Sequence, residues 1–323
     1  MKAKKIKNFL RIKIFAQNKK NTLEKIKKYI KKNNQFCHIV SLNPENLVIA
    51  KENKKFKKVI ETAQIQIIDG VGMILASRLL CVSVGERYPG VDLVIDLLNL
   101  SSKMRLRVLL IGARSNLAKR LANCYQKKYS PAKFFGLEGI LDIKNPKKEE
   151  EEKIFSIVSD FKPHLVLVAF GSPDQELWIE RHKKEFKNCV VMGVGGAFDF
   201  LGGVVPRAPL FLRRLGLEWL FRLLVQPWRW RRQLRLLKFL WLIFWEVLGR
   251  LFNEMLFFSL KTFFEIVSEI VVNLTSGWLG FLMAPLVFGE KLENYSYLLT
   301  KGLFFSILGL LVCFWFREKS KKI

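Results

Sequence analysis

The sequence predicts an α/β fold with a mainly parallel sheet flanked by helices, followed by an α-helical, membrane-associated C-terminal region. Three observations support this prediction. From about residue 11 to 200, short apolar or β-branched runs alternate with charge-decorated helical stretches. From Arg213 onward, long apolar stretches that carry arginines replace this alternation. The chain has 323 residues, enough for a domain of about 200 residues with its own core and a substantial appendage.

The first part of the chain contains candidate strands, each a short apolar or β-branched run. They are residues 11–15, 36–43, 65–69, 107–112, 133–136, 165–171 and 189–196. Candidate helices lie between them, at residues 21–32, 45–59, 71–80, 91–101, 115–128, 148–160 and 174–185. This alternation predicts right-handed βαβ units and a mainly parallel sheet. Ligands collect beyond the carboxyl ends of such strands, so the polar residues that follow each strand are candidate site residues.

The segment after the sheet is expected to be helical and to contact a membrane. Residues 207–238, which we call the appendage, are rich in Arg and Trp and have the composition of an interfacial helix. Within it, Pro227 is expected to end one helix and begin the next. A long amphipathic helix is expected over residues 239–269, because charged residues recur there every three, four or seven positions. They are Glu246, Arg250, Glu254, Lys261, Glu265 and Glu269.

Two apolar runs within residues 270–323 are expected to form a transmembrane helical hairpin. Residues 270–289 contain no charged side chain, and a helix of roughly 20 such residues spans a bilayer. Residues 302–316 reach a spanning length when the helix is extended back to Tyr295. Basic segments flank this pair and a slightly acidic link joins it, so the positive-inside rule places both ends in the cytoplasm. A pair of buried helices in a homo-oligomer is the alternative.

Positive charge is concentrated in two segments of a chain whose formal net charge is +27. Residues 1–35 hold thirteen Lys or Arg and one Glu, and residues 207–238 hold nine and one. Such patches suit anionic lipid, pyrophosphate or nucleic acid. The Trp and Leu residues of the appendage favour lipid, and no zinc-finger spacing or aromatic RNA-binding signature occurs. The expected organisation is a basic arm at 1–10 and a sheet domain at 11–206, followed by the three C-terminal segments above.

The cysteines and the N-terminus indicate the compartment. The five cysteines are scattered, form no CxxC pair and are expected to be buried small hydrophobes in a reducing compartment: Cys37, Cys81, Cys124, Cys189 and Cys313. No continuous apolar run follows the basic N-terminal residues, which argues against a secretory signal. We therefore expect the sheet domain to lie in the cytoplasm.

Polar residues at the ends of two early strands are candidates for chemistry. Asp69 ends a strand and is followed by a glycine turn that would expose its carboxylate, where it could act as a general base on a sugar hydroxyl. The alternative is an Asp that caps the helix beginning near Val71. Ser41 and Asn43 end the preceding strand and can hydrogen-bond a sugar hydroxyl, or form a turn and a cap for the helix begun by Pro44.

Glycines follow several later strands and predict close approach of a ligand to the backbone. Gly112 ends one strand, and Gly171 opens GSPDQELW, where Ser172 or Asp174 could cap the next helix and Gln175 would point to the cleft. GVGGAFDF carries Gly195, Gly196 and Asp199 directly after a buried strand. Main-chain amides there can cradle a diphosphate while Asp199 holds a ribose. The segment is neither a Walker loop nor a GxGxxG fingerprint.

No metal-ligand pattern occurs in the sequence. There is no DxD triplet to hold a metal–nucleotide complex, and His38, His164 and His182 show neither metal-ligand spacing nor a nucleophile partner. We expect these histidines to pack or to lie at the surface. Arg87, in GERYPG, lies in a polar loop after a helix and carries no signal by itself.

Taken together, the motifs resemble the WecG/TagA/CpsF family of bacterial glycosyltransferases. The matching stretches run in family order from about residue 36 to 235: SLNPENLVIA, DGVGMILASRLL, GERYPGVDL, AFGSPDQELWI and GVGGAFDFLGGVVPRAPLFLRRLGLEWLFRLLVQPWRW. The resemblance implies a Rossmann-like fold and an inverting transferase that requires no metal or other cofactor. It implies transfer of an N-acetylmannosamine-type sugar from a UDP donor to N-acetylglucosamine on undecaprenyl diphosphate.

The resemblance also implies roles for individual residues. Asp69 would be the base that deprotonates the acceptor hydroxyl, and Ser41 and Asn43 would line the sugar-nucleotide site. Arg87 and Gln175 fall where relatives place substrate-contacting residues. The appendage arginines would engage diphosphate at the membrane: Arg222, Arg229 and Arg232. Two departures affect the donor contacts, because Ser41 stands where Thr is usual and the aromatic segment after the fourth strand is reduced to GLEGIL.

The sequence thus favours a glycosyltransferase at the cytoplasmic face of the bacterial plasma membrane, acting in teichoic acid, capsule or common-antigen synthesis. Its expected partners are a UDP-sugar, a polyprenyl-diphosphate-linked sugar and anionic lipid. Charge developing on the leaving UDP would then be met by arginines and backbone amides in place of a metal. One alternative is a UDP-sugar-binding membrane scaffold without catalysis. Another is a basic protein that binds nucleic acid through residues 1–35. The sequence leaves the sugar and the oligomeric state open.

Overall fold

The computed structural model of the chain describes residues 6–15, 17–32, 34–113, 116–288 and 295–322. The chain forms two compact units, Met1–Phe244 and Trp245–Ile323, which are described separately. The first unit contains the sheet and the appendage. The second contains two helical segments.

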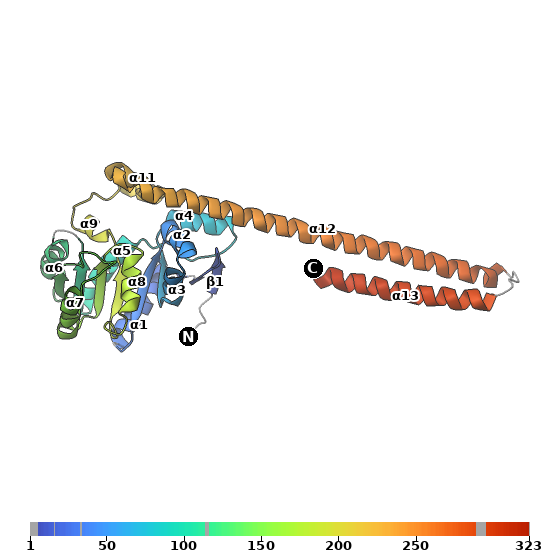
Figure 1. Ribbon diagram of the computed structural model, residues 1–323, viewed down its shortest axis with the longest axis horizontal. Coiled ribbons are helices and arrows are strands. Elements are labelled where there is room, and N and C mark those ends of the chain that lie inside the picture. Colours follow the sequence, from blue (N-terminus) through green and yellow to red (C-terminus); the bar gives the residue numbers. More distant parts are fainter. Residues whose placement is uncertain (1–5, 16, 33, 114–115, 289–294, 323) are drawn as a thin grey trace. The chain divides into compact units, whose positions relative to one another are not determined.

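The first unit is built on a six-stranded, wholly parallel sheet in the order β4-β3-β8-β7-β5-β6 (Figure 1). Its strands are β3 Cys37–Leu42, β4 Ile65–Ile68, β5 Arg107–Gly112, β6 Lys133–Leu137, β7 Leu165–Ala169 and β8 Val190–Gly193. Each corresponds to one candidate strand between residues 36 and 196. Parallel strands covered on both faces read as continuous apolar runs, which explains why the sequence revealed them.

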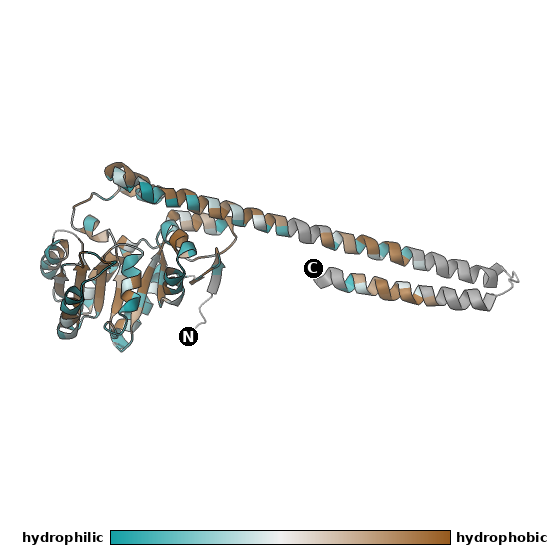
Figure 2. Ribbon diagram, viewed as in Figure 1, coloured by the Kyte–Doolittle hydropathy of each residue, from teal (hydrophilic) through white to brown (hydrophobic). Residues whose placement is uncertain are grey.

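Helices cover both faces of the sheet. They are α1 Lys19–Lys32, α2 Pro44–Glu52, α3 Lys54–Thr62, α4 Val71–Leu79, α5 Gly90–Lys103, α6 Leu117–Lys128, α7 Lys148–Phe161 and α8 Asp174–Arg181. Successive side chains of β5 point to opposite faces. Val108 and Leu110 therefore join a core with α1, α5 and α6, whereas Leu109 and Ile111 join one with α7 and α8. Figure 2 shows hydrophobic strands inside and hydrophilic helix surfaces outside. The predicted α/β fold is confirmed.

Two elements differ from the sequence prediction. Residues 45–59 form two helices, because Asn53 ends α2 and its side chain accepts a hydrogen bond from the Phe56 amide, which begins α3 (3.0 Å). Residues 12–15 form β2 Ile12–Phe15, which pairs antiparallel with β1 Ile6–Phe9 outside the parallel sheet. The turn residues Leu10 and Arg11 have φ of 51° and 62°, as a two-residue hairpin turn requires.

The appendage consists of short helices that lead into a long one. After α9 Ala197–Leu201 come α10 Leu210–Leu215, α11 Glu218–Val225, the 3₁₀ turn η1 Pro227–Arg229, and α12 Trp230–Phe288. The break expected at Pro227 is confirmed. Ion pairs fasten this region to the sheet domain: Arg207 with Asp92, Arg235 with Glu45, and Lys238 with Glu52. Phe239 is fully buried next to Gly72.

The second unit is a helical pair formed by the later part of α12 and by α13 Tyr295–Lys322. The helices approach closely at Gly309, where an added Cβ would lie 2.2 Å from Thr275, and the rings of Phe264 and Phe316 are 5.6 Å apart. Small or polar residues are buried: Ser268, Thr275, Ser306 and Cys313. Large apolar side chains are exposed: Phe263, Ile266, Ile270, Phe304, Ile307, Leu310, Leu311, Phe314 and Trp315.

The predicted transmembrane hairpin is not confirmed. No helix in the described parts of the chain combines the length and apolarity that crossing a bilayer requires. Part of the hairpin lies outside the described residues, because the link at 289–294 and most side chains between 276 and 303 are not described. In the expected charged stripe of α12, Glu246 and Arg250 form an ion pair at 3.7 Å.

Candidate active site

Two neighbouring cavities open at the carboxyl ends of the strands in the first unit. The larger, of about 900 Å³, is the glycine-loop cavity, bounded by the loops after β7 and β8 at Gly171 and Gly195. The smaller, of about 470 Å³, is the appendage cavity, bounded by α4, α10, α11 and the start of α12. The polar residues that line both are Asn43, Glu45, Asp69, Arg222, Arg229 and Arg232. The cavities therefore meet at Asp69 and three appendage arginines.

Asp69 directly follows β4. Its carboxylate accepts hydrogen bonds from the Ser41 hydroxyl (3.2 Å) and from the Gly90 amide. The helix-cap alternative is wrong, because Gly70 is the N-cap of α4 and no side chain caps that helix. Burial raises the pKa of Asp69, and the charge of Glu218 raises it further, while the Gly90 amide, Ser41 and Arg87 act in the opposite direction.

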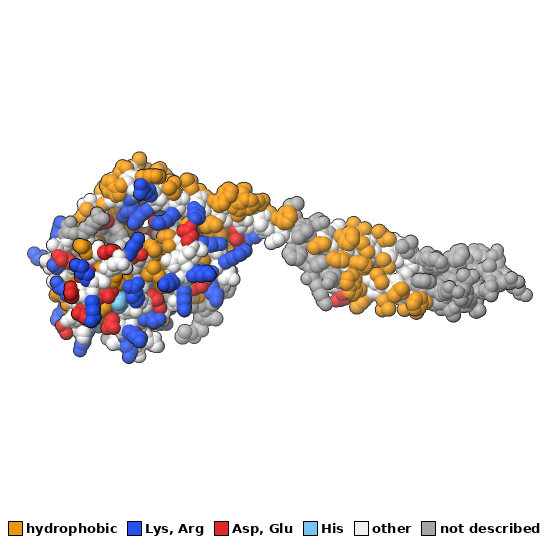
Figure 3. Space-filling view, in the orientation of Figure 1, with side chains coloured by type: hydrophobic (Ala, Val, Ile, Leu, Met, Phe, Trp, Pro, Cys, Tyr) orange, Lys and Arg blue, Asp and Glu red, His pale blue; other side chains and the backbone are white. Residues whose placement is uncertain are grey.

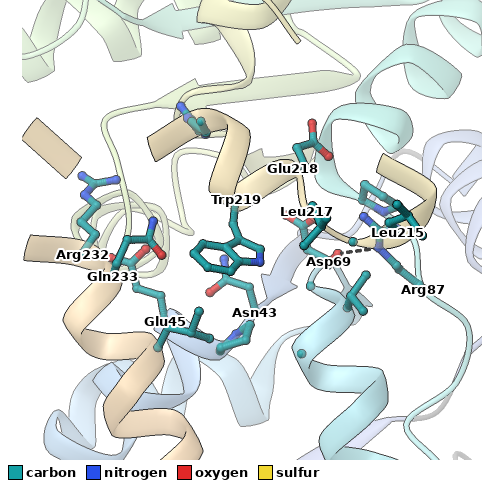
Figure 4. Close-up of a pocket in the computed structure, with 18 of the residues that line it drawn as sticks. Asn43, Glu45, Asp69, Arg87, Leu215, Leu217, Glu218, Trp219, Arg232 and Gln233 are labelled. Atoms are coloured by element: carbon teal, nitrogen blue, oxygen red, sulfur yellow. Dashed lines mark hydrogen bonds between the residues drawn. The ribbon is translucent and has the colours of Figure 1, made fainter. Parts of the chain in front are cut away.

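Arg87 connects Asp69 to the appendage. Its Nε donates to the Asp69 carbonyl oxygen (3.2 Å; dashed in Figure 4), and its Nη1 donates to the Arg213 carbonyl oxygen (3.1 Å). The side chain also lines the appendage cavity. Both its hydrogen bonds reach main-chain atoms, so this geometry fixes the position of the loop that carries the carboxylate.

Ser41 and Asn43 lie at the end of β3, beside Asp69. Asn43 is the N-cap of α2, since its Oδ1 accepts from the Asn46 amide (2.8 Å), as the turn-and-cap alternative expected. The Asn46 side chain in turn donates to the Ser41 carbonyl oxygen (2.8 Å). Ser41 lines the glycine-loop cavity and Asn43 lines both cavities, so the cap that shapes this turn also forms the wall.

Gln175 ties the two glycine loops together. Its Oε1 accepts from the amides of Gly171 (3.1 Å) and Gly195 (3.0 Å), and its Nε2 donates to Glu176 (2.7 Å). Two amides expected to cradle a diphosphate are therefore already donated within the protein. Neither Ser172 nor Asp174 caps α8, because Pro173 is the N-cap without a side-chain bond. The Ser172 hydroxyl instead donates to Asn46 Oδ1 (2.9 Å).

The other predicted glycines and Asp199 divide between the cavity and the sheet. Gly171, Gly195, Gly196 and Asp199 line the glycine-loop cavity. Gly112 does not line it. It has a φ of 98°, and an added Cβ would lie 2.9 Å from the Ala169 carbonyl oxygen, so its geometry serves close packing against β7.

The appendage arginines form a cluster of like charges in the shared wall. Arg222 lies over the Phe200 ring at 4.5 Å and donates from Nε to Gln226 Oε1 (3.3 Å). Its Nη2 is buried without a hydrogen-bond partner in the described part of the chain. Arg229 donates to the same Gln226 oxygen (3.3 Å). Burial and the charges of Arg222 and Arg232 lower the pKa of Arg229 to about 10. Such a cluster is a ready site for an anion.

The appendage cavity has an apolar wall opposite these charges. Figure 4 shows Trp219 in its centre beside Asn43, with Leu215 and Leu217 between it and Arg87. Further apolar side chains line it from α4 and α12: Val71, Leu75, Leu236 and Leu240. The cavity can therefore take a ligand that is anionic at one end and apolar at the other.

Sequence reasoning missed Glu218, Arg207 and Glu176. Glu218 lines the appendage cavity and accepts from Arg207 Nε (3.2 Å). Glu176 is buried in the wall of the glycine-loop cavity, and burial raises its pKa. Their hydrogen-bond partners and burial depend on the tertiary fold. One local indication of these residues was present in the sequence, because Glu176 directly follows the predicted site residue Gln175.

The histidines and most cysteines have structural positions away from this site. Burial lowers the pKa of His38 to about 3, His164 Nδ1 accepts from the Arg107 amide (3.1 Å), and His182 contacts Glu151 (2.9 Å). Three cysteines are buried as expected, whereas Cys81 and Cys124 are exposed, so that prediction is wrong for these two. Among the described residues, no group of three or more His, Cys, Asp or Glu is arranged to hold a metal ion.

Comparison with known proteins identifies the family. The sequence profile described as "Glycosyl transferase WecG/TagA/CpsF family" matches residues 7–253. The chain belongs to this family. It is 32% identical over 200 residues to an N-acetylglucosaminyldiphosphoundecaprenol N-acetyl-β-D-mannosaminyltransferase of Staphylococcus aureus (strain NCTC 8325 / PS 47), covering 62% of this chain and 74% of that protein. It is 31% identical over 202 residues to the protein of that name from Bacillus subtilis (strain 168), covering 62% and 76%.

The chain is therefore a glycosyltransferase, and its predicted family is confirmed. The WecG/TagA/CpsF match extends past the sheet domain, through the appendage and into α12. The arginine cluster and the sheet-end carboxylate thus lie in the part of the chain that matches the family. The second unit lies almost entirely outside the match.

Proposed function

We propose that this glycosyltransferase moves an N-acetylmannosamine-type sugar from a UDP donor to N-acetylglucosamine on undecaprenyl diphosphate. The observation that carries the proposal is the position of Asp69 where two cavities meet beneath three arginines. The names of the relatives support the sugar and the acceptor. The UDP donor, inversion and independence of metal are parts of the proposal that rest on the chemistry of this site.

The donor is assigned to the glycine-loop cavity. This cavity is the larger, and Ser41, Asn43 and Asp199 supply groups that can hydrogen-bond sugar and ribose hydroxyls. Because Gly171 and Gly195 already donate their amides to Gln175, the donor diphosphate relies mainly on the arginines. Arg222 offers a buried, unpartnered Nη2 in the described part of the chain, and an anion there would also relieve repulsion among the three guanidinium groups.

The lipid-linked acceptor is assigned to the appendage cavity. Its diphosphate would meet the arginine side of the wall, and the first part of the prenyl chain would lie against Leu217, Trp219 and Leu236. In this arrangement both substrates reach Asp69 from opposite sides. A basic cluster at the meeting point then neutralises two diphosphates held close together.

The proposed reaction is a single displacement. Asp69 takes the proton of the acceptor hydroxyl, whose oxygen forms a bond to the anomeric carbon as the bond from that carbon to the UDP oxygen breaks. Attack from the face opposite the leaving group inverts the anomeric configuration. Negative charge that develops on UDP is stabilised by Arg222, Arg229 and Arg232. The raised pKa of Asp69 suits a general base, because a base is most effective when its pKa lies near the pH at which the enzyme works.

We also propose that the protein acts at the cytoplasmic face of the bacterial plasma membrane. Figure 3 shows hydrophobic side chains and basic residues along the appendage face of the first unit. The exposed apolar residues there are Leu210, Phe211, Leu215, Trp219, Leu220, Leu224, Trp228, Trp230, Leu234, Leu237, Leu240, Trp241 and Phe244. Tryptophan, leucine and arginine in one surface are typical of an interfacial membrane contact.

The second unit supports the same proposal. It buries small or polar residues between its helices and exposes large apolar ones, the reverse of a helical pair in water. Helix pairs in lipid use this arrangement, because small residues allow close approach and lipid solvates the apolar exterior. Packing of this unit against a second copy of the chain is the alternative, and cross-linking in membranes distinguishes the two.

The function is tested by product analysis. Radiolabelled UDP-N-acetylhexosamines, including the uronic acid form, are incubated with a short-chain polyprenyl-diphosphate N-acetylglucosamine acceptor. We expect label in the lipid fraction with the N-acetylmannosamine donor and an inverted linkage in the product. A scaffold without catalysis would bind UDP and leave every donor intact.

A further inference from the structure

A second carboxylate faces the Asp69 region from the appendage. Glu218 is the first residue of α11 and lines the appendage cavity together with Asp69. Figure 4 shows Glu218, Asp69 and Arg87 on the same side of Trp219. None of the roles assigned above to donor, acceptor or base uses Glu218. A carboxylate in a cavity meant for diphosphates is unfavourable for binding them, so its position calls for another explanation.

Arg207 holds Glu218 in place. Its Nε donates to Glu218 Oε1 (3.2 Å) and its Nη2 donates to Asp92 Oδ1 (2.7 Å) on α5. The Arg207 and Glu218 side chains are only 17% and 21% exposed. The planar guanidinium thereby joins α11 to the sheet domain with defined geometry. Glu218 is fixed in the cavity wall only while the appendage is docked on the domain.

The charged groups around Asp69 come from two parts of the fold. Arg87 approaches from the loop before α5, Arg222 from α11, and Glu218 from the start of α11. The two arginines favour the ionised carboxylate, whereas burial and Glu218 favour its protonated form. Glu218 is the anionic neighbour that raises the pKa of Asp69 most, second only to burial, among the described residues.

We propose that Glu218 is a positioning residue that makes Asp69 a stronger base, and that Arg207 couples this effect to docking of the appendage. The inference rests on the proposed function, because it deepens the role assigned there to Asp69. A carboxylate surrounded only by arginines would be a weak base. Opposing their charge with a fixed anion restores the proton affinity of Asp69, and the ion pair with Arg207 offsets the repulsion between that anion and the substrate diphosphates.

The docked appendage therefore does two things at once. It brings Arg222, Arg229 and Arg232 to the diphosphates, and it brings Glu218 to the base. With the appendage displaced, Asp69 would lose both the burial and the neighbouring anion that raise its pKa. Proton abstraction is thus efficient only in the closed arrangement that also holds the acceptor.

The test is the pH dependence of transfer by the full chain in three variants. Glu218→Gln keeps the size of the side chain and removes its charge, so the acidic limb of kcat should move to lower pH by roughly one unit. On the plateau, kcat should fall by roughly three- to ten-fold, because the base is weaker. Arg207→Gln releases Glu218 from its docked position, so its acidic limb should also move to lower pH.

Glu52→Gln is the matched control. It breaks the ion pair with Lys238, which also joins the appendage to the sheet domain, and Glu52 lines neither cavity. Its acidic limb should coincide with that of the wild type. A merely structural role of the Arg207 cluster would lower the melting temperature of Glu218→Gln and Arg207→Gln and leave every limb unmoved. That result would overturn the proposal.

A second measurement separates this inference from the proposed function. Titration of the Asp69 carboxyl by ¹³C NMR, assigned with Asp69→Asn, reports its pKa without turnover. One possible result is that the wild type transfers no sugar, while the pKa of Asp69 is lower in Glu218→Gln than in the wild type. That result would refute the proposed function and support the electrostatic coupling. Turnover by the wild type with no change in pKa or limb would refute the coupling alone. If Glu218→Gln does not fold, Arg207→Gln provides the test. A shift of its acidic limb to lower pH supports the coupling, and an unmoved limb refutes it.

Discussion

At the scale of single residues, Asp69 is an ionisable group whose burial lowers the stability of the folded protein. Burial and Glu218 raise its pKa above the ordinary 3.8. Ionising the folded protein is therefore harder than ionising the unfolded chain. Stability falls as pH rises above 3.8 and stays reduced once pH exceeds the folded pKa. A penalty of this kind is expected for a group with a chemical role, such as the one proposed for Asp69.

Asp69→Asn should therefore separate activity from stability. Transfer should fall at least about 100-fold, because proton abstraction is lost, while UDP binding by calorimetry should persist. The melting temperature at neutral pH should rise by a few degrees, and the difference should shrink as pH approaches 3.8. Asp142→Asn, in a loop with only local partners, is the control and should retain activity. Turnover by Asp69→Asn at the wild-type rate would remove Asp69 from the mechanism.

Gln175 is a residue whose position was predicted but whose bonding was not. Its place in the first turn of a helix after β7 followed from the sequence. The pairing of its Oε1 with two amides on different loops depends on β7 and β8 being neighbours. A substrate-contacting role and a role in tying the loops together are compatible, because the loops that Gln175 joins bound the glycine-loop cavity, the proposed donor site.

Gln175→Ala should weaken both folding and donor binding. Two partly buried amides would lose their acceptor, at about 1 kcal/mol each, and the loops would separate. We expect a lower melting temperature and a several-fold higher KM for the donor. Gln126→Ala is the matched control, because Gln126 likewise bridges main-chain groups, near Ala132 and Phe134, away from the cavities. Equal effects of the two variants on KM would contradict a role for Gln175 in the donor site.

At the scale of elements, the strands were predictable and their exceptions have local causes. The strands from β3 to β8 are mainly apolar, as a buried parallel sheet requires, although Gln66 is buried in β4 and Phe135 is exposed on the edge strand β6. The run at residues 12–15 looked similar, but it pairs with β1, and Gln66 on β4 bonds its main chain at Lys13 and Phe15 in place of a strand ladder. The periodicity of residues 45–59 did not show the break at Asn53, since one asparagine can end one helix and cap another.

The appendage helices were predicted as basic and apolar, but not as part of the site wall. Arg207 contacts Asp92, 115 positions earlier, and Arg87 contacts Arg213, 126 positions later. No local pattern encodes such pairs. The resemblance placed Arg222, Arg229 and Arg232 near diphosphate, and the structure brings all three to the junction of the two cavities.

Arginine substitutions in the appendage should weaken anion binding in proportion to burial of the side chain. Pyrophosphate should raise the melting temperature of the wild type, because it binds only the folded protein. Arg222→Gln should reduce this shift strongly and lower transfer by about 10- to 1000-fold. Arg214→Gln, an exposed arginine of α10 that lines neither cavity, is the control and should keep the pyrophosphate shift. An unchanged shift in Arg222→Gln would place the anion elsewhere.

At the scale of the whole molecule, the chain combines an α/β sheet domain with extensive exposed apolar surface in each of its two units. The sequence indicated this from composition alone. Which apolar residues are exposed depends on packing, as shown by Phe239, which is buried, and Leu240, which is exposed. These two neighbours on α12 could not be distinguished by composition.

Membrane binding should depend on the exposed aromatic residues of the appendage. The full chain should float with vesicles containing anionic lipid, and added salt should weaken this association. Replacing Phe211 and Trp230 with Ser should reduce flotation while leaving UDP binding intact, because both side chains are exposed and neither lines a cavity. Replacing the exposed Leu141, which lies on a loop outside the appendage, is the control. Equal flotation of all variants would show that this face does not contact lipid.

The central claim is that one carboxylate, set between two cavities, activates a lipid-borne hydroxyl toward a soluble sugar nucleotide. Its most direct test is single-turnover transfer of radiolabelled N-acetylmannosamine from UDP to polyprenyl-diphosphate N-acetylglucosamine, comparing the wild type with Asp69→Asn. We predict an inverted disaccharide product with the wild type, and bound but unreacted donor with the variant. Product formed at the same rate by both proteins would contradict the account.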